Sequence, residues 1–161
     1  MEYNHPIAFL LTVVTYGAWL HGDERGSVKH GEPAKFLPPD ELLKQHNASN
    51  LKHPSATLNA RQRGIVRRNI ESYCDYKKWF VSAVNVRTNH FHVVVAAVEK
   101  PEKMLNGIKA AVTRKLREAD EFVGRPVWAV RGSKRRLYTR KSLDLAIDYV
   151  VNRQGDPLPE E

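Results

Sequence analysis

The stretch WFVSAVNVRTNHFHVVVAAV, from Trp79 to Val98, decides the fold of this chain. It contains two runs rich in valine and aromatic residues, Trp79–Arg87 and His90–Val98, which are separated only by Thr88 and Asn89. Apolar, β-branched runs joined by so short a connection are typical of an antiparallel hairpin. The stretch therefore predicts two adjacent strands in the middle of the chain.

Helical patterns lie on both sides of this hairpin. Before it, apolar residues recur at helical spacing over about Asn59–Tyr76, and arginines occupy the other side of the same segment. After it, Pro101 suits the first turn of a second helix, whose apolar stripe extends over Met104–Ala119. A third helix is predicted over Ser142–Asn152, with Gly155 as its stop signal.

The remaining segments complete the predicted order of elements. Ile7–Leu20 is rich in Val, Leu and Thr, so we expect a buried first strand there. A long irregular insertion is expected at about residues 21–55, with a short helical turn at Pro39–Gln45. Gly124–Arg140 has the pattern of a basic connecting segment with at most a short strand. This order predicts a single α+β domain over residues 1–161, with helices packed on an antiparallel, ferredoxin-like sheet.

Composition and charge limit the classes of function. Lys and Arg outnumber Asp and Glu by 26 to 18, and the resulting net charge of +8 suits a polyanionic partner, although a merely solvated basic surface has the same composition. The single cysteine, Cys74, excludes an internal disulfide and fits a buried residue in a reducing, cytoplasmic setting. The apolar run Ile7–Val14 is too short to cross a bilayer, so no membrane association is expected.

A pair of histidines stands out in the second run of the hairpin. Side chains alternate between the two faces of a strand, so His90 and His92 point to one side, and Phe91 and Val93 point to the core. Two imidazoles about 7 Å apart along a strand can converge on one divalent cation. The alternative is an ordinary solvated strand face, which is the commoner case for so short a motif. The other five histidines fall in the N-terminal tail and the long insertion, whereas this pair lies on a predicted rigid element.

Three tyrosines in the later part of the chain differ in their predicted surroundings. Tyr73 lies on the apolar side of the first helix and suits the core, whereas Tyr138 follows a basic cluster and suits base stacking or a strand end. Tyr149 lies off the apolar stripe of the third helix, as either a boundary residue or an exposed nucleophile. The predicted buried stripe of that helix consists of Leu143, Ile147, Val150 and Val151.

Three segments together resemble the REP-associated tyrosine transposases, bacterial relatives of the single-tyrosine transposases of insertion sequences. Val86–Val95 resembles their HUH motif, in which a bulky hydrophobic residue separates two histidines. Thr15–Ser27 resembles the opening of these proteins. Ala146–Val151, followed by Gln154 and Gly155, resembles the helix that carries their nucleophilic tyrosine. The three segments occur in the family's order, which is more specific than the histidine pair alone, and the resemblance extends over nearly the whole chain.

The resemblance implies a metal-dependent DNA endonuclease and strand transferase. His90 and His92 would hold a divalent metal ion, Mg or Mn, and Tyr149 would attack a DNA phosphate to form a 5′-phosphotyrosine link. The implied partner is single-stranded or hairpin DNA, bound by a monomer or a homodimer. No nucleotide cofactor is implied, because the phosphotyrosine bond conserves the energy for rejoining. Basic residues on the second helix and in the connecting segment are the expected DNA contacts: Lys109, Arg114, Lys115, Arg131, Lys134, Arg135 and Arg136.

One departure from the family leaves alternatives open. Its members carry a polar metal ligand one turn after the tyrosine, where this chain has Arg153, which cannot bind a cation. Asn152 and Gln154 are the neighbouring residues that could substitute for it. The alternative function is therefore a catalytically weak or inactive hairpin-DNA-binding protein of the same fold. A structural basic protein with incidental histidines is a third possibility. Because both histidines are expected at a surface, alanine at either position should leave the fold nearly intact.

Overall fold

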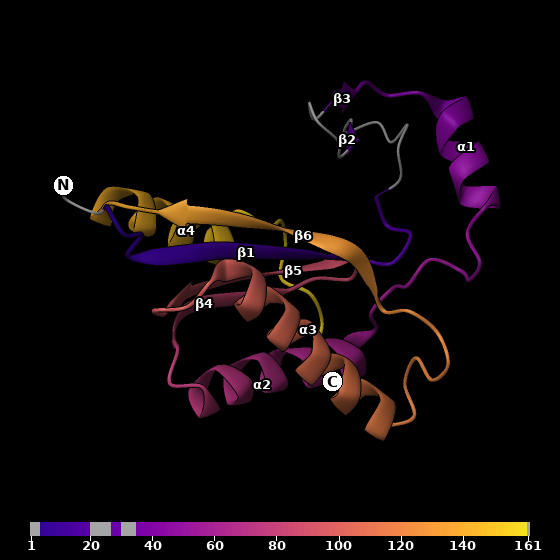
Figure 1. Cartoon of the computed structure of the whole chain (residues 1–161). Helices are drawn as coiled ribbons and strands as arrows, with labels where there is room; N and C mark the ends of the chain where they lie inside the picture. The colour runs from indigo at the N-terminus through magenta and orange to yellow at the C-terminus, as the bar shows by residue number, and fades with distance from the viewer. Residues whose placement is uncertain (1–3, 20–26, 30–34, 161) are drawn as a thin grey trace.

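A computed structural model describes residues 4–19, 27–29 and 35–160 of the chain. Its central element is a four-stranded antiparallel sheet in the order β4-β5-β1-β6 (Figure 1). The strands are β1 (Ala8–Thr15), β4 (Phe80–Val86), β5 (His90–Ala96) and β6 (Trp128–Leu137). Strand order and connections together match the βαββαβ arrangement of ferredoxin-like folds, which confirms the predicted fold class.

Helices cover both faces of this sheet. Figure 1 shows α2 (Ala60–Tyr76) and α3 (Pro101–Glu118) side by side on one face and α4 (Arg140–Asn152) on the other. The side chains of Asn59 and Thr139 cap the first turns of α2 and α4, which explains where these helices begin. The three helices predicted from the sequence are confirmed, with ends that differ by two residues or fewer.

The alternation of side chains in the central strands divides the core into two layers. Phe91 and Val93 of β5 pack in the larger layer, toward α2 and α3. Val94 packs in the smaller layer with Ala146 and Val150 of α4. The prediction that Phe91 and Val93 face the core is therefore confirmed, and it places His90 and His92 on the α4 side of the sheet.

The segment predicted as a basic connector is instead a ten-residue edge strand. β6 pairs with β1 from Leu137, opposite Ala8, to Trp128, opposite Thr15. Only the first and last residues of β6 are buried. The segment therefore lacks the hydrophobic alternation that would have indicated a strand. β1 itself ends at Thr15 and not at Leu20, which lies outside the described residues.

The insertion contains more regular structure than its sequence predicts. It holds α1 (Glu41–Ser49) and the short paired strands β2 (Ser27–Lys29) and β3 (Lys35–Leu37). The predicted turn at Pro39–Gln45 is thus a longer helix that begins after the capping residue Asp40. α1 buries no residue and lies beside the layered body (Figure 1). Across the described residues, no helix has the length and apolarity that crossing a membrane requires.

Candidate active site

The two histidines of β5 belong to a polar patch on the α4 side of the sheet. Strand pairing aligns one row of side chains across this face: Asn85 of β4, His92, Thr12 of β1 and Ser133 of β6. His90 lies two residues along the same strand, and its ring centroid is 4.8 Å from that of His92. This separation is shorter than the rise of two strand residues, about 6.6 Å, so the rings lean toward each other. The predicted shared face is confirmed.

His92 is buried and held by the neighbouring strand. Its Nδ1 lies 2.7 Å from Oγ1 of Thr12, and the residue is only 5% exposed. Burial, with a smaller contribution from His90, lowers the pKa of His92 to about 4, although a hydrogen bond with Gln154 opposes this shift. The ring is therefore neutral at neutral pH, which is the form that binds metals. The expectation of a surface histidine is wrong at this position.

His90 has partners on both ring nitrogens. Nδ1 lies 2.7 Å from Oδ1 of Asn89, and Nε2 lies 3.2 Å from Oε1 of Gln154. The Gln154 amide is oriented in turn, because its Nε2 donates to the backbone carbonyl of Tyr149 at 3.0 Å. In both histidines Nδ1 thus has a fixed partner, an arrangement typical of imidazoles that bind a metal through Nε2.

Gln154 is the polar residue after the tyrosine that reaches the histidines. Asn152 and Arg153 instead bind the two carboxylate oxygens of Asp148, each at 2.9 Å. Helical geometry ends at Asn152, and Gly155 adopts a left-handed φ of 82°. If the helix continued, the residue one turn after Tyr149 and on the same face would be Arg153. Because the helix ends first, the turn that follows it brings Gln154 over β5 instead.

Tyr149 lies in the last turn of α4, against His92. The two ring centroids are 5.3 Å apart in an edge-on contact, and Tyr149 is 43% exposed. Nδ2 of Asn85 donates to the carbonyl of Val150 at 2.9 Å and so ties this turn to the sheet beside His92. The prediction that Tyr149 lies off the buried stripe is confirmed. The prediction that Val151 is buried is wrong, because it is exposed.

Tyr138 lies at the opposite end of the sheet. It directly follows Leu137, which pairs with Ala8, whereas His92 pairs with Thr12. Four residues of extended strand separate these two pairs, which corresponds to about 13 Å. Of the two tyrosines, Tyr149 is therefore the one that shares a site with the histidines.

The basic residues of β6 divide between the two faces of the sheet. The register with β1 puts Arg135 on the histidine face, where it is exposed. Lys134 and Arg136 alternate to the α3 side, and Nζ of Lys134 lies 4.0 Å from a carboxylate oxygen of Glu102. Arg131 is exposed beside the irregular part of the β1–β6 pairing. Within this cluster, Arg135 is thus the side chain that clearly shares the histidine face.

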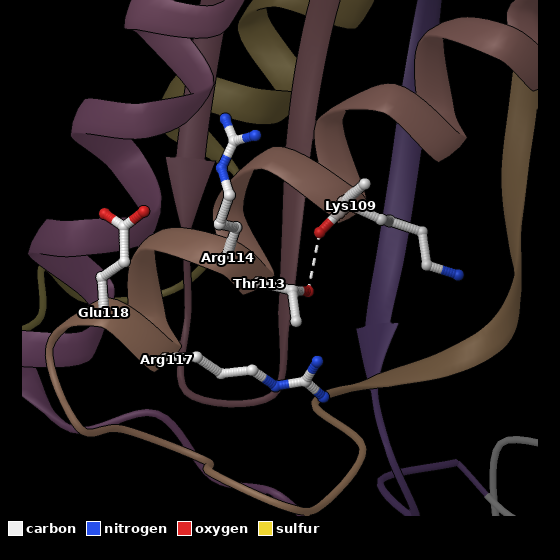
Figure 2. Close-up of a pocket in the computed structure, with 6 residues that line it drawn as sticks. Lys109, Thr113, Arg114, Arg117 and Glu118 are labelled. Atoms are coloured by element: carbon white, nitrogen blue, oxygen red, sulfur yellow. Dashed lines mark hydrogen bonds between the residues drawn. The ribbon is translucent and has the colours of Figure 1, made fainter.

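The expected DNA contacts on α3 lie on the other side of the sheet from the histidines. Nζ of Lys109 donates to the carbonyls of Ala129 and Val130 at 2.8 and 3.2 Å, and burial lowers the pKa of Lys109. Its ammonium therefore anchors the start of β6. Arg114 and Lys115 are exposed, and Lys115 pairs with Glu118 at 3.0 Å. Figure 2 shows Lys109 and Arg117 extending toward the same side of α3 and Arg114 pointing away from them, so the three do not converge on one point.

The site has a limited set of metal-binding side chains. Within the described part of the chain, no group of three or more His, Cys, Asp or Glu residues could hold a metal ion. A metal ion at the two imidazoles would therefore need a different kind of third donor. The amide oxygen of Gln154, already within 3.2 Å of His90, is positioned to be that donor.

Comparison with known proteins identifies relatives of the fold. The sequence matches no protein-family model and no curated protein. The structure resembles that of a REP-associated tyrosine transposase bound to a REP hairpin, at 12% identity and a TM-score of 0.53, over 93% of this chain and 68% of that one. The likeness is one of fold. A protein of Deinococcus radiodurans assigned as a transposase is 10% identical, with a TM-score of 0.49 over 97% of both chains.

Proposed function

We propose that this protein is a metal-dependent DNA endonuclease and strand transferase that uses Tyr149 as its nucleophile. The observation that carries the proposal is the cluster of three rings, in which His92 lies 4.8 Å from His90 and 5.3 Å from Tyr149. These side chains come from β5 and α4, on one face of a fold that resembles a transposase structure. That transposase was solved with a REP hairpin, which supports hairpin DNA as the substrate class here.

His90, His92 and Gln154 would hold the divalent ion. Two imidazoles and one amide oxygen form a mixed donor set that suits Mn²⁺ and accepts Mg²⁺ less readily. When bound, the ion would supply Lewis-acid polarisation of the scissile phosphate. Three protein ligands leave coordination positions for substrate oxygens, which a catalytic site requires.

Tyr149 would carry out the covalent step. Its phenolic oxygen loses its proton and forms a bond to phosphorus, the bond from phosphorus to the 3′ oxygen breaks, and that oxygen gains a proton and leaves as a hydroxyl. The downstream DNA fragment is then linked to the protein through its 5′ phosphate, and the reverse reaction rejoins a strand. The partial exposure of Tyr149 gives a strand access, while its contact with His92 and the Asn85 tether restrict its position.

A covalent adduct assay tests this proposal. Protein is incubated with hairpin DNA that carries single-stranded flanks, with Mn²⁺ or Mg²⁺, and then resolved on a denaturing gel. We expect a metal-dependent protein–DNA adduct that a chelator abolishes. Peptide mass spectrometry should locate the DNA on Tyr149.

A hairpin-binding protein without turnover is the second candidate function. It is favoured by the lack of a third His, Cys, Asp or Glu ligand among the described residues, since a neutral amide is a weaker metal ligand. This candidate predicts preferential binding of hairpin DNA and no adduct with either metal. That outcome would contradict the proposed enzyme.

Thr12 is expected to position His92 for metal binding. Replacing Thr12 with Val keeps the side-chain shape but removes the hydroxyl that fixes Nδ1, so Mn²⁺ affinity should fall by about 10- to 100-fold. Titration calorimetry measures the change, and Thr12→Ser, which keeps the hydroxyl, should restore most of the affinity. Wild-type Mn²⁺ affinity in Thr12→Val would show that this hydrogen bond has no part in metal binding.

A further inference from the structure

A groove lined by arginines lies at the β4 edge of the sheet. It has a volume of about 660 Å³ and is bounded by α2, by β4 and by the chain that follows α4. Figure 1 shows the chain passing from α4 back toward the α2 side of the sheet. Four arginines line the groove: Arg63, Arg67, Arg68 and Arg87.

These arginines leave the groove positively charged. Its lining includes two acidic residues, Glu71 and Glu160, against the four arginines. Only Arg67 is paired with a lining carboxylate, with Nε 3.3 Å from Glu71 in an exposed contact that contributes little. In the described part of the chain, no acidic side chain pairs with Arg68.

A purely structural role accounts for two of the four arginines. Arg63 donates to the carbonyl of Pro159 at 2.7 Å, and Arg87 donates to that of Asp156 at 3.0 Å. These bonds hold the chain after α4 in place, although a backbone carbonyl does not neutralise a guanidinium.

Among the described residues, Arg67 and Arg68 donate to no such backbone carbonyl, and both are exposed. A Cβ atom at Gly64 would lie 3.0 Å from Nη1 of Arg68, so the guanidinium of Arg68 lies beside Gly64, which itself lines the groove. Apart from the exposed pair of Arg67 with Glu71, no described contact of the fold accounts for these two charges.

The groove begins next to the candidate active site. The backbone N–H of Arg87 donates to the carbonyl of His90 at 2.8 Å. Gly155, which lines the groove, directly follows Gln154, whose amide contacts His90. A DNA strand held at the histidine pair would thus enter the groove as it leaves the site.

We propose that this groove binds the phosphates of the single-stranded DNA that flanks the phosphate attacked by Tyr149. The inference rests on the proposed function, since it requires a strand at the histidine pair. Guanidinium groups bind phosphate oxygens through paired, charge-assisted hydrogen bonds, which suits a row of arginines along a strand. Contacts of this kind position the strand without reading its sequence.

The double variant Arg67→Gln/Arg68→Gln tests the groove. Both positions are exposed, and glutamine is a good helix former, so the fold should be retained. Affinity for a hairpin with both single-stranded flanks should fall by about tenfold at low salt. The slope of log affinity against log salt should become shallower by roughly 1.4, because each lost contact to single-stranded DNA accounts for about 0.7.

A matched control removes the same charge elsewhere. Lys100→Gln/Lys103→Gln lies at the other end of β5 from the histidines and should leave both affinity and slope unchanged. On a hairpin trimmed of its flanks, the groove variant should bind like wild type.

Several results would overturn the groove assignment. These are wild-type affinity and slope in the groove variant, an equal loss of affinity for the trimmed hairpin, or an equal loss in the control variant. If the wild-type protein binds the flanked hairpin without forming an adduct, the result counts against the proposed enzyme. The salt slopes of the wild type and the groove variant still test whether the groove binds the flank. A wild-type protein that does not bind the hairpin contradicts both proposals.

Discussion

Replacing Tyr149 with phenylalanine should eliminate the covalent protein–DNA adduct and lower metal-dependent cleavage by on the order of a thousandfold or more. The substitution removes only the hydroxyl and keeps the edge-on contact with His92. Metal affinity and hairpin affinity should therefore remain close to those of wild type. Adduct yield on a denaturing gel and fluorescence anisotropy with labelled hairpin measure the two properties separately.

Tyr138→Phe is the matched control for this substitution. Tyr138 is exposed to nearly the same extent as Tyr149, at 42% against 43%, but it lies at the other end of the sheet from the histidines. We expect its removal to leave adduct formation unchanged. An adduct that persists in Tyr149→Phe, or one that maps to Tyr138, would refute the nucleophile assignment without affecting the case for the metal site.

The sequence predicts those elements of the fold that bury one side. α2 and α3 each carry an apolar stripe, and the first residues of β5 alternate between histidines and core residues, so these patterns are visible in the sequence. β6 lacks this signal because only Trp128 and Leu137 are buried. An edge strand of this kind is held by backbone pairing to β1, which the side-chain pattern does not display.

The candidate site is predictable in part for the same reason. Strand alternation puts His90 and His92 together, and helical phase separates Tyr149 from the buried stripe. The partners of the histidines depend instead on tertiary register. Thr12 lies 80 positions from His92 in the chain and meets it only because β1 pairs with β5. Thr12 is one of two threonines in the otherwise apolar strand β1, and this is the one local signal that could have indicated it.

Charge can be counted from the sequence, but its location cannot be derived from the count. Lys109, one of the expected DNA contacts, uses its ammonium to anchor β6, and Lys134 faces Glu102. From the sequence alone, the arginines of α2 would be interpreted as the solvent-exposed face of a helix. They line a groove only because the chain after α4 returns beside them, held by Arg63.

Loss of either imidazole should remove metal-dependent cleavage. A bound cation contributes several kcal/mol to stabilising charge in phosphoryl transfer, so His90→Ala and His92→Ala should each lower the rate by about a thousandfold or more. The two variants should differ in stability. His90 is half-buried, whereas His92→Ala leaves a buried cavity and an unpartnered Thr12 hydroxyl, which costs about 1–3 kcal/mol of unfolding free energy.

Metal-dependent thermal unfolding separates the loss of the ligand from the loss of stability. Wild type in Mn²⁺ at a hundred times its Kd should gain about 2.7 kcal/mol, because the ion binds only the folded state. His90→Ala should keep nearly the wild-type Tm without metal but show no increase when Mn²⁺ is added. His92→Ala should start lower and also show no increase. If both variants were still stabilised by Mn²⁺, the ion would bind elsewhere, and the assignment of the metal site to the two imidazoles would be wrong.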